Sequence, residues 1–204
     1  MALKFANNNS LSAITSAPSG VGGGSLNLIS TQTASSSSTI SFTSGIDSTY
    51  KQYLFKFINL HPSADSAALL FNMSVDSGSN YNVTKTTTIF EARHTEDGAT
   101  SSVAYSGRTL SEDLAQSTSF QRLANNASSD SDHGVSGYIH LFDPSDTTFI
   151  KSYIGLISVV NNNNGAYQYY NAGYGNTTSA VDAIQFKMDS GNIDSGTIKL
   201  YGIS

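Results

Sequence analysis

The chain has 204 residues, a formal net charge of −5 and a charged fraction of only 12%, about half that of an average soluble domain. It has no Cys, which excludes disulfides, thiolate metal sites and cysteine nucleophiles, and its acidic balance argues against nucleic acid as a partner. Its apolar runs fall far short of the roughly 20 residues that cross a bilayer, so we expect no membrane insertion.

Ser, Thr and Asn dominate the composition, with 35, 19 and 17 residues, which resembles the composition of secreted proteins. The length fits one domain, and a chain of this mass buries roughly 70% of its unfolded surface, enough for a core without disulfides. Met1–Ser10 lacks the apolar segment of a secretory signal. We therefore expect a protein that leaves its cell inside a particle, by lysis; a cytoplasmic protein of unusual composition is the alternative.

Residues 1–24 are poor in hydrophobic side chains and rich in Asn, Ser and Gly. Such a segment buries too little apolar surface to fold alone, so we predict an extended N-terminal arm that becomes ordered on a neighbouring subunit. The glycines at 20–24 lack the preceding strand that a dinucleotide-binding loop needs. Residues 25–204 are expected to form the folded domain.

From Leu26 onward, hydrophobic side chains recur at every second position, which is typical of strands with one buried face. The alternation is clearest in residues 53–58, 69–75, 138–142, 184–188 and 197–201. Clusters of turn-forming residues separate these runs at 61–65, 76–80, 143–146, 161–165 and 189–196. The pattern predicts an all-β fold, an antiparallel β-sandwich that is jelly-roll-like.

Residues 84–133 carry the weakest pattern. We expect a strand at 84–94, one helical turn at 110–117 with Ser111 as its N-cap, and a loop at 128–132. The whole chain has only three Glu, which leaves few i,i+4 ion pairs to support longer helices.

No metal site and no cofactor is predicted. The histidines lack the spacing of zinc ligands; they are His61, His94, His133 and His140. Several loop carboxylates are expected to stabilise turns, with a calcium site as the alternative. These are Asp130, Asp132, Asp143 and Asp146.

One group of carboxylates is dense enough to raise the question of a glycosidase, which needs two carboxylates about 5–9.5 Å apart in a cleft. Its members are Glu91, Glu96, Asp97, Glu112 and Asp113. Neighbours on a strand point to opposite faces, so we interpret the group as a solvated acidic surface and expect no enzymatic activity.

The stretch Asn161–Gly175 combines tyrosines with Asn, Gly and Gln. Tyr offers a flat apolar ring with a polar tip, and Asn and Gly give adaptable hydrogen bonds. Four tyrosines are therefore candidate binding residues for a glycan or a neighbouring subunit: Tyr167, Tyr169, Tyr170 and Tyr174. A hairpin whose alternating tyrosines cover a sheet face is the alternative.

Several segments resemble virion structural proteins of tailed bacteriophages, especially marine and cyanobacterial ones. They are ISFTSGIDSTYKQYLFKFINLHPSAD (Ile40–Asp65), LLFNMSVDSGSNY (Leu69–Tyr81), DPSDTTFIKSYIG (Asp143–Gly155) and AVDAIQFKMDSGNIDSGTIKLYGIS (Ala180–Ser204). The resemblance covers most of residues 26–204 and is weakest across 84–133. It implies a β-sandwich building block of the virion, in a tail fibre or as a capsid decoration, and it carries over no catalytic residue.

Together these observations predict a non-enzymatic structural protein of a tailed-phage virion, assembled in the host cytoplasm and released by lysis. Its expected partners are other virion proteins of the capsid or tail and sister subunits in a homo-oligomer, with a trimer as the first guess. The alternative is a receptor-binding module that recognises a host surface glycan.

Overall fold

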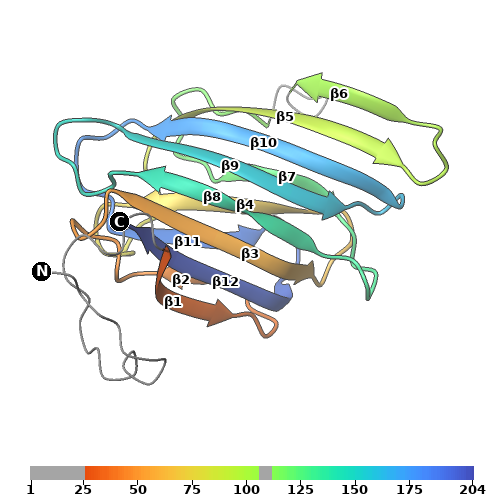
Figure 1. The fold of residues 1–204 in the computed structure, drawn as a ribbon, viewed down its shortest axis with the longest axis horizontal. Coiled ribbons are helices and arrows are strands. Elements are labelled where there is room, and N and C mark those ends of the chain that lie inside the picture. The colour runs from red at the N-terminus through yellow and green to blue at the C-terminus, as the bar shows by residue number, and fades with distance from the viewer. Residues whose placement is uncertain (1–25, 106–111) are drawn as a thin grey trace, which may run out of the picture.

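The computed structural model describes residues 26–105 and 112–204; the arm predicted for residues 1–24 lies outside them. The described residues form twelve strands in two antiparallel sheets that pack face to face (Figure 1). They include no helix, and so none that could cross a membrane. The all-β antiparallel sandwich that the alternation predicts is confirmed.

The large sheet has eight strands and the small sheet has four. In spatial order the large sheet contains β1 (Leu26–Thr33), β12 (Ile193–Ile203), β3 (Gln52–Pro62), β8 (Val135–Phe142), β9 (Lys151–Val160), β10 (Gly165–Gly175), β5 (Lys85–Thr95) and β6 (Ser101–Tyr105). The small sheet contains β2 (Ile40–Phe42), β11 (Ala183–Met188), β4 (Ala67–Ser74) and β7 (Gln121–Ala127).

Eight of these strands make a jelly roll. In the large sheet the order is β1-β12-β3-β8, and in the small sheet it is β2-β11-β4-β7. The chain therefore crosses between the sheets at β1–β2, β2–β3, β3–β4, β4–β5, β6–β7, β7–β8, β10–β11 and β11–β12. Two interleaved Greek keys of this kind define a jelly roll, which confirms the predicted architecture.

Two insertions widen the large sheet beyond the jelly roll. β5 and β6 follow β4 in the chain, and β9 and β10 follow β8. β10 pairs along nearly its whole length with both β9 and β5, which joins the two insertions. We call these four strands the overhang, because they continue the large sheet past β7, the edge strand of the small sheet (Figure 1).

The core lies between the sheets, and Phe186 of β11 is at its centre. Its ring centroid lies 5.5 and 5.1 Å from those of Phe55 and Phe57, which belong to the opposite sheet. Phe42 and Phe71, on the strands beside β11, lie 6.3 and 6.4 Å away. Aromatic pairs at such separations stabilise a core beyond the burial of their area, so this cluster joins the two sheets.

Strand pairing gives the sandwich two different ends. Leu26 pairs with Ile203, so the first and last described strands meet at one end. At the opposite end, Thr95 of β5 pairs with Gly165 of β10, and Pro62 ends β3. We call this second end the loop end, because the β3–β4, β5–β6, β7–β8, β9–β10 and β11–β12 connections gather there (Figure 1).

The helical turn expected at 110–117 is wrong for residues 112–117, which form bends and one bridge. Their hydrogen bonds go to β5 instead: Ser117 and Lys85 exchange backbone bonds, and the Asp113 carboxylate accepts the N–H of Ile89 at 2.8 Å. The edge of β5 thus captures the groups that a helix would use. The turn expected at 189–196 is shorter than predicted, because β12 begins at Ile193.

Candidate functional site

The overhang forms a cleft at the loop end, where it passes the edge of the small sheet. The cleft has a volume of about 340 Å³, within the range of small-molecule sites. We call it the overhang cleft, and its lining residues are Glu91, Arg93, Thr95, Asp97, Thr100, Glu112, Asn126, Asn161, Asn163 and Tyr167.

Strand alternation places the side chains on one side of this cleft. Glu91 and Arg93 are two residues apart on β5, so both point toward the small sheet. Tyr167 pairs with Arg93 from the neighbouring strand β10, and the Arg93 guanidinium lies over the Tyr167 ring, 6.0 Å from its centroid. One ring and one cation therefore pack together at the cleft.

Side-chain hydrogen bonds fix β7 on the other side. The Tyr169 hydroxyl donates to the carbonyl of Asn125 at 3.3 Å, and the Asn171 amide donates to the carbonyl of Leu123 at 2.8 Å. Both bonds run from β10 to β7 and so join the two sheets. They bring Asn126, the next residue of β7, into the lining of the cleft.

The β9–β10 turn closes a further side. The Asn161 side-chain oxygen accepts the N–H groups of Asn163 and Gly165 at 3.1 and 2.9 Å. Asn164 has a φ of 51°, a left-handed conformation that Asn adopts more readily than most residues. The Asn161 side chain and the left-handed backbone of Asn164 therefore shape this turn.

Glu112 is the least satisfied polar group of the cleft. It is only 8% exposed, and its Oε2 atom is buried without a hydrogen-bond partner. Burial, followed by the charge of Glu91, raises the pKa of Glu112 to about 7. The neutral form of the Glu112 carboxyl is therefore favoured to a higher pH than in an exposed glutamate.

Glu91 is 3% exposed and lies beside a cation, with its Oε1 atom 3.9 Å from Nη1 of Arg93. Burial and the charges of Glu91 and Glu112 raise the pKa of the Tyr169 hydroxyl. Both carboxyls and the tyrosine thus belong to one electrostatic cluster.

The expectation of a solvated acidic surface is wrong for Glu91 and Glu112, which are buried together in the cleft. It holds for Glu96, which is exposed, and for Asp97, whose Oδ1 accepts the Thr95 hydroxyl at 2.7 Å and the Ala99 N–H at 2.9 Å in the β5–β6 turn. Glu91 lies two residues after the apolar Ile89 on the same strand, so both point to the same face and the burial of Glu91 was predictable. Glu112 carries no such signal.

The four candidate tyrosines do not form one site. Tyr167 and Tyr169 point inward, and only Tyr167 lines the overhang cleft. Tyr170 lies on the opposite face of β10 and stacks on Phe90, with ring centroids 4.5 Å apart. The Tyr174 hydroxyl lies 3.5 Å from the Gln116 amide. Ligand binding by these residues stays a prediction.

No protein-family model matches this sequence, and a search of curated proteins finds no match.

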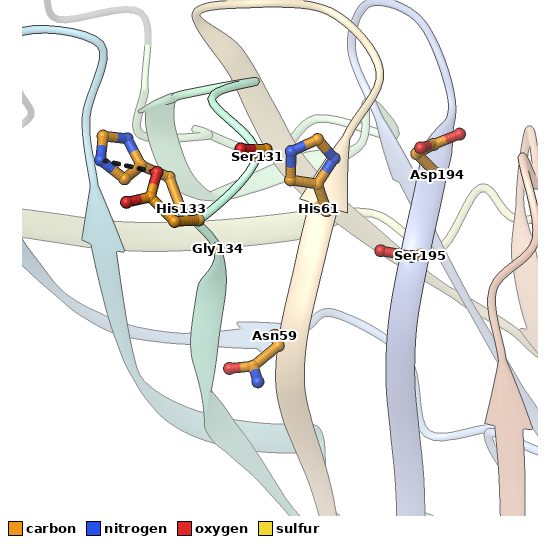
Figure 2. Close-up of a pocket in the computed structure, with 8 residues that line it drawn as sticks. Asn59, His61, Ser131, His133, Gly134, Asp194 and Ser195 are labelled. Carbon is orange, nitrogen blue, oxygen red and sulfur yellow. Dashed lines mark ion pairs between the residues drawn. The ribbon is translucent and has the colours of Figure 1, made fainter.

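Figure 2 shows a second hollow at the loop end, of about 430 Å³. Its polar lining consists of Asn59, His61, Ser131, Asp132, His133, Gly134, Asp194 and Ser195. His133 lies 3.8 Å from the carboxylates of both Asp130 and Asp132, which are largely exposed. Within residues 26–105 and 112–204, no three His, Cys, Asp or Glu side chains gather as a metal ion requires.

The acidic group in the cleft predicts a pH-dependent stability. A carboxyl whose pKa is raised from 4.5 to about 7 destabilises the fold progressively as pH rises through that window. Glu112→Gln stays neutral, so we expect it to match wild type near pH 4.5 and to exceed it at pH 8. The expected gain is on the order of 2 kcal/mol, or about 4–8 °C in Tm.

Thermal unfolding at several pH values measures this difference. Glu96→Gln is the matched control, because Glu96 is exposed and should give no pH-dependent gain. A Tm difference for Glu112→Gln that is constant from pH 4.5 to pH 8 contradicts the assignment.

Proposed function

We propose that the protein is a non-enzymatic structural module of a tailed-phage virion, in a tail fibre or a capsid decoration. The observation that carries the proposal is the complete jelly-roll order of the strands, an architecture common in viral capsid and lectin domains. The sequence resemblance to phage structural proteins supports the same role. Residues 1–24 are the proposed attachment to other virion proteins.

The outer face of the large sheet supports an assembly role. On β8, β9, β10, β5 and β6, all in the described part of the chain, the outward side chains include no Asp, Glu, Lys or Arg. His140 also points outward on this face. Burial lowers the pKa of its imidazole, which favours the uncharged form. Interface cores are depleted of charge and enriched in aromatic residues, so this face suits contact with protein.

An aromatic row crosses this uncharged face. Strand register aligns four aromatic residues and one leucine side by side: Tyr138, Leu156, Tyr170, Phe90 and Tyr105. An apolar hollow of about 270 Å³ lies along the row. We propose that sister subunits pack on this row, in a homo-oligomer such as a trimer.

Charge inserted into the face tests the assembly. Ile154 is half exposed beside the aromatic row, and we expect Ile154→Glu to convert the wild-type oligomer to a monomer, because a buried unpaired carboxylate is costly. Sedimentation velocity measures this change. Thr147→Glu adds the same charge at an exposed loop position and should leave the oligomer intact. A monomeric wild-type protein contradicts the proposed subunit contact.

The virion role has its own test. Particles released by lysis from cells that express the phage genes should contain the chain in fixed stoichiometry, and cryo-electron microscopy should place it on the capsid or tail. Deletion of residues 1–24 should leave a folded sandwich that is missing from particles. Particles without the chain, or unchanged incorporation of the deletion variant, contradict the proposal.

A further inference from the structure

We propose that the overhang cleft is a binding site for a neutral saccharide, and that the Glu112 carboxyl contacts a hydroxyl of the bound sugar. This inference goes beyond the structural role, because a module can be assembled through its outer sheet face and bind a ligand at its loop end.

The Glu112 carboxyl of the cleft has an unsatisfied oxygen. A buried carboxyl oxygen without a hydrogen bond is costly and rare in folded proteins. Glu112 Oε2 is such an atom and belongs to a residue that lines the cleft. A ligand hydroxyl supplies the missing partner, and it does so whether the carboxyl is protonated or ionised, because a hydroxyl both donates and accepts.

The lining of the cleft mixes amide and hydroxyl side chains. Amides come from Asn126 and Asn163, and hydroxyls come from Thr95 and Thr100. The cleft therefore offers both donors and acceptors, which matches a ligand that carries several hydroxyl groups. Tyr167 also lines the cleft, with the Arg93 guanidinium over its ring, and adds apolar surface to the polar lining.

The charge of the lining excludes other ligand classes. Among the described residues, the cleft lining holds three carboxyls, from Glu91, Asp97 and Glu112, and one cation, Arg93, so it disfavours phosphate or an acidic sugar. In the described residues, the carboxyls do not gather as a metal site requires. A neutral polyhydroxylated molecule matches the amide and hydroxyl groups of the lining without adding charge to it.

The test is a titration of the full chain with neutral oligosaccharides of glucose, galactose, mannose and N-acetylglucosamine. Calorimetry and ligand-observed NMR measure the binding. At least one of these sugars should bind. Glu112→Gln keeps the shape of the side chain but loses the carboxyl, and we expect it to weaken binding about tenfold.

Two pairs of variants separate the cleft from the rest of the surface. Glu96→Gln is the control for Glu112→Gln, because Glu96 lies outside the cleft lining. Tyr201→Ala is the control for Tyr167→Ala, because Tyr201 lies on β12, outside the cleft lining. We expect Tyr167→Ala to abolish binding and both controls to retain it, while circular dichroism verifies that each variant is folded.

Three results would overturn the site: none of the four sugars binds, Glu112→Gln binds as tightly as wild type, or Tyr201→Ala removes binding while Tyr167→Ala does not. None of these results bears on incorporation into particles, so failure of the site is distinguishable from failure of the structural role. Cleavage of a bound sugar that Glu112→Gln abolishes would support the site and contradict a non-enzymatic role.

Discussion

Phe186→Ala is expected to lower the free energy of unfolding by about 3–5 kcal/mol. Phe186 is fully buried and contacts aromatic rings of both sheets, among them Phe57 at 5.1 Å and Phe71 at 6.4 Å between centroids. Truncation leaves a cavity that rings held by two packed sheets cannot fill. A loss of this size is a large share of the stability of a typical domain.

Chemical denaturation monitored by circular dichroism measures the loss. Phe149→Ala removes the same atoms from a side chain that is 72% exposed, and should change stability by less than about 0.5 kcal/mol. Equal losses in the two variants contradict the position of Phe186 as the link between the sheets.

Gly137→Ala is the second change with a large expected effect, a loss of about 3 kcal/mol or more. Gly137 lies in β8 between Phe57 of β3 and Ile157 of β9. A Cβ atom there would lie 2.2 Å from the Leu156 carbonyl oxygen, and the φ of +152° disfavours other residues. The added methyl group must therefore push apart two hydrogen-bonded strands.

Gly98→Ala provides the control. Gly98 also has a positive φ, +69°, but a Cβ atom there would meet nothing within 4 Å. It should cost only the roughly 1–2 kcal/mol of a left-handed Ala. If Gly137→Ala costs no more than Gly98→Ala, the close approach of β8 and β9 is contradicted.

Much of the fold could be predicted from the sequence, because period-two alternation reports a local property of each strand. Residues 138–142, 184–188 and 197–201 lie in strands and alternate in burial as predicted, and residues 53–58 and 69–74 also lie in strands. The prediction of one buried face is wrong for β4, which is buried on both faces, and the run predicted to reach Val75 ends at Ser74. The pairing of β10 with β5 could not be predicted, because it joins segments far apart in the chain. The overhang, and with it the cleft, depends on that pairing.

The same limit explains the candidate site. Because side chains alternate between the two faces of a strand, the sequence already predicts that Tyr167 and Tyr170 of β10 point to opposite faces. No local pattern predicts that Glu112 lies beside Glu91. Composition was also misleading for charged residues in the core: Lys85 and Lys151 are fully buried, and the ammonium group of Lys151 is hydrogen-bonded to the carbonyl of Phe149 at 2.6 Å. Such burial depends on loop carbonyls that only the folded chain brings within reach.

The pairing of β1 with β12 has a consequence for how the molecule reaches its native state. The strands that open and close the described chain are hydrogen-bonded neighbours, with Leu26 opposite Ile203. Contacts between such distant segments form late, since a long loop must first lose its entropy. The consecutive strands β8, β9 and β10 need only short turns to pair, so we expect this meander to form early and the jelly roll to close around it on the slow timescale of all-β proteins.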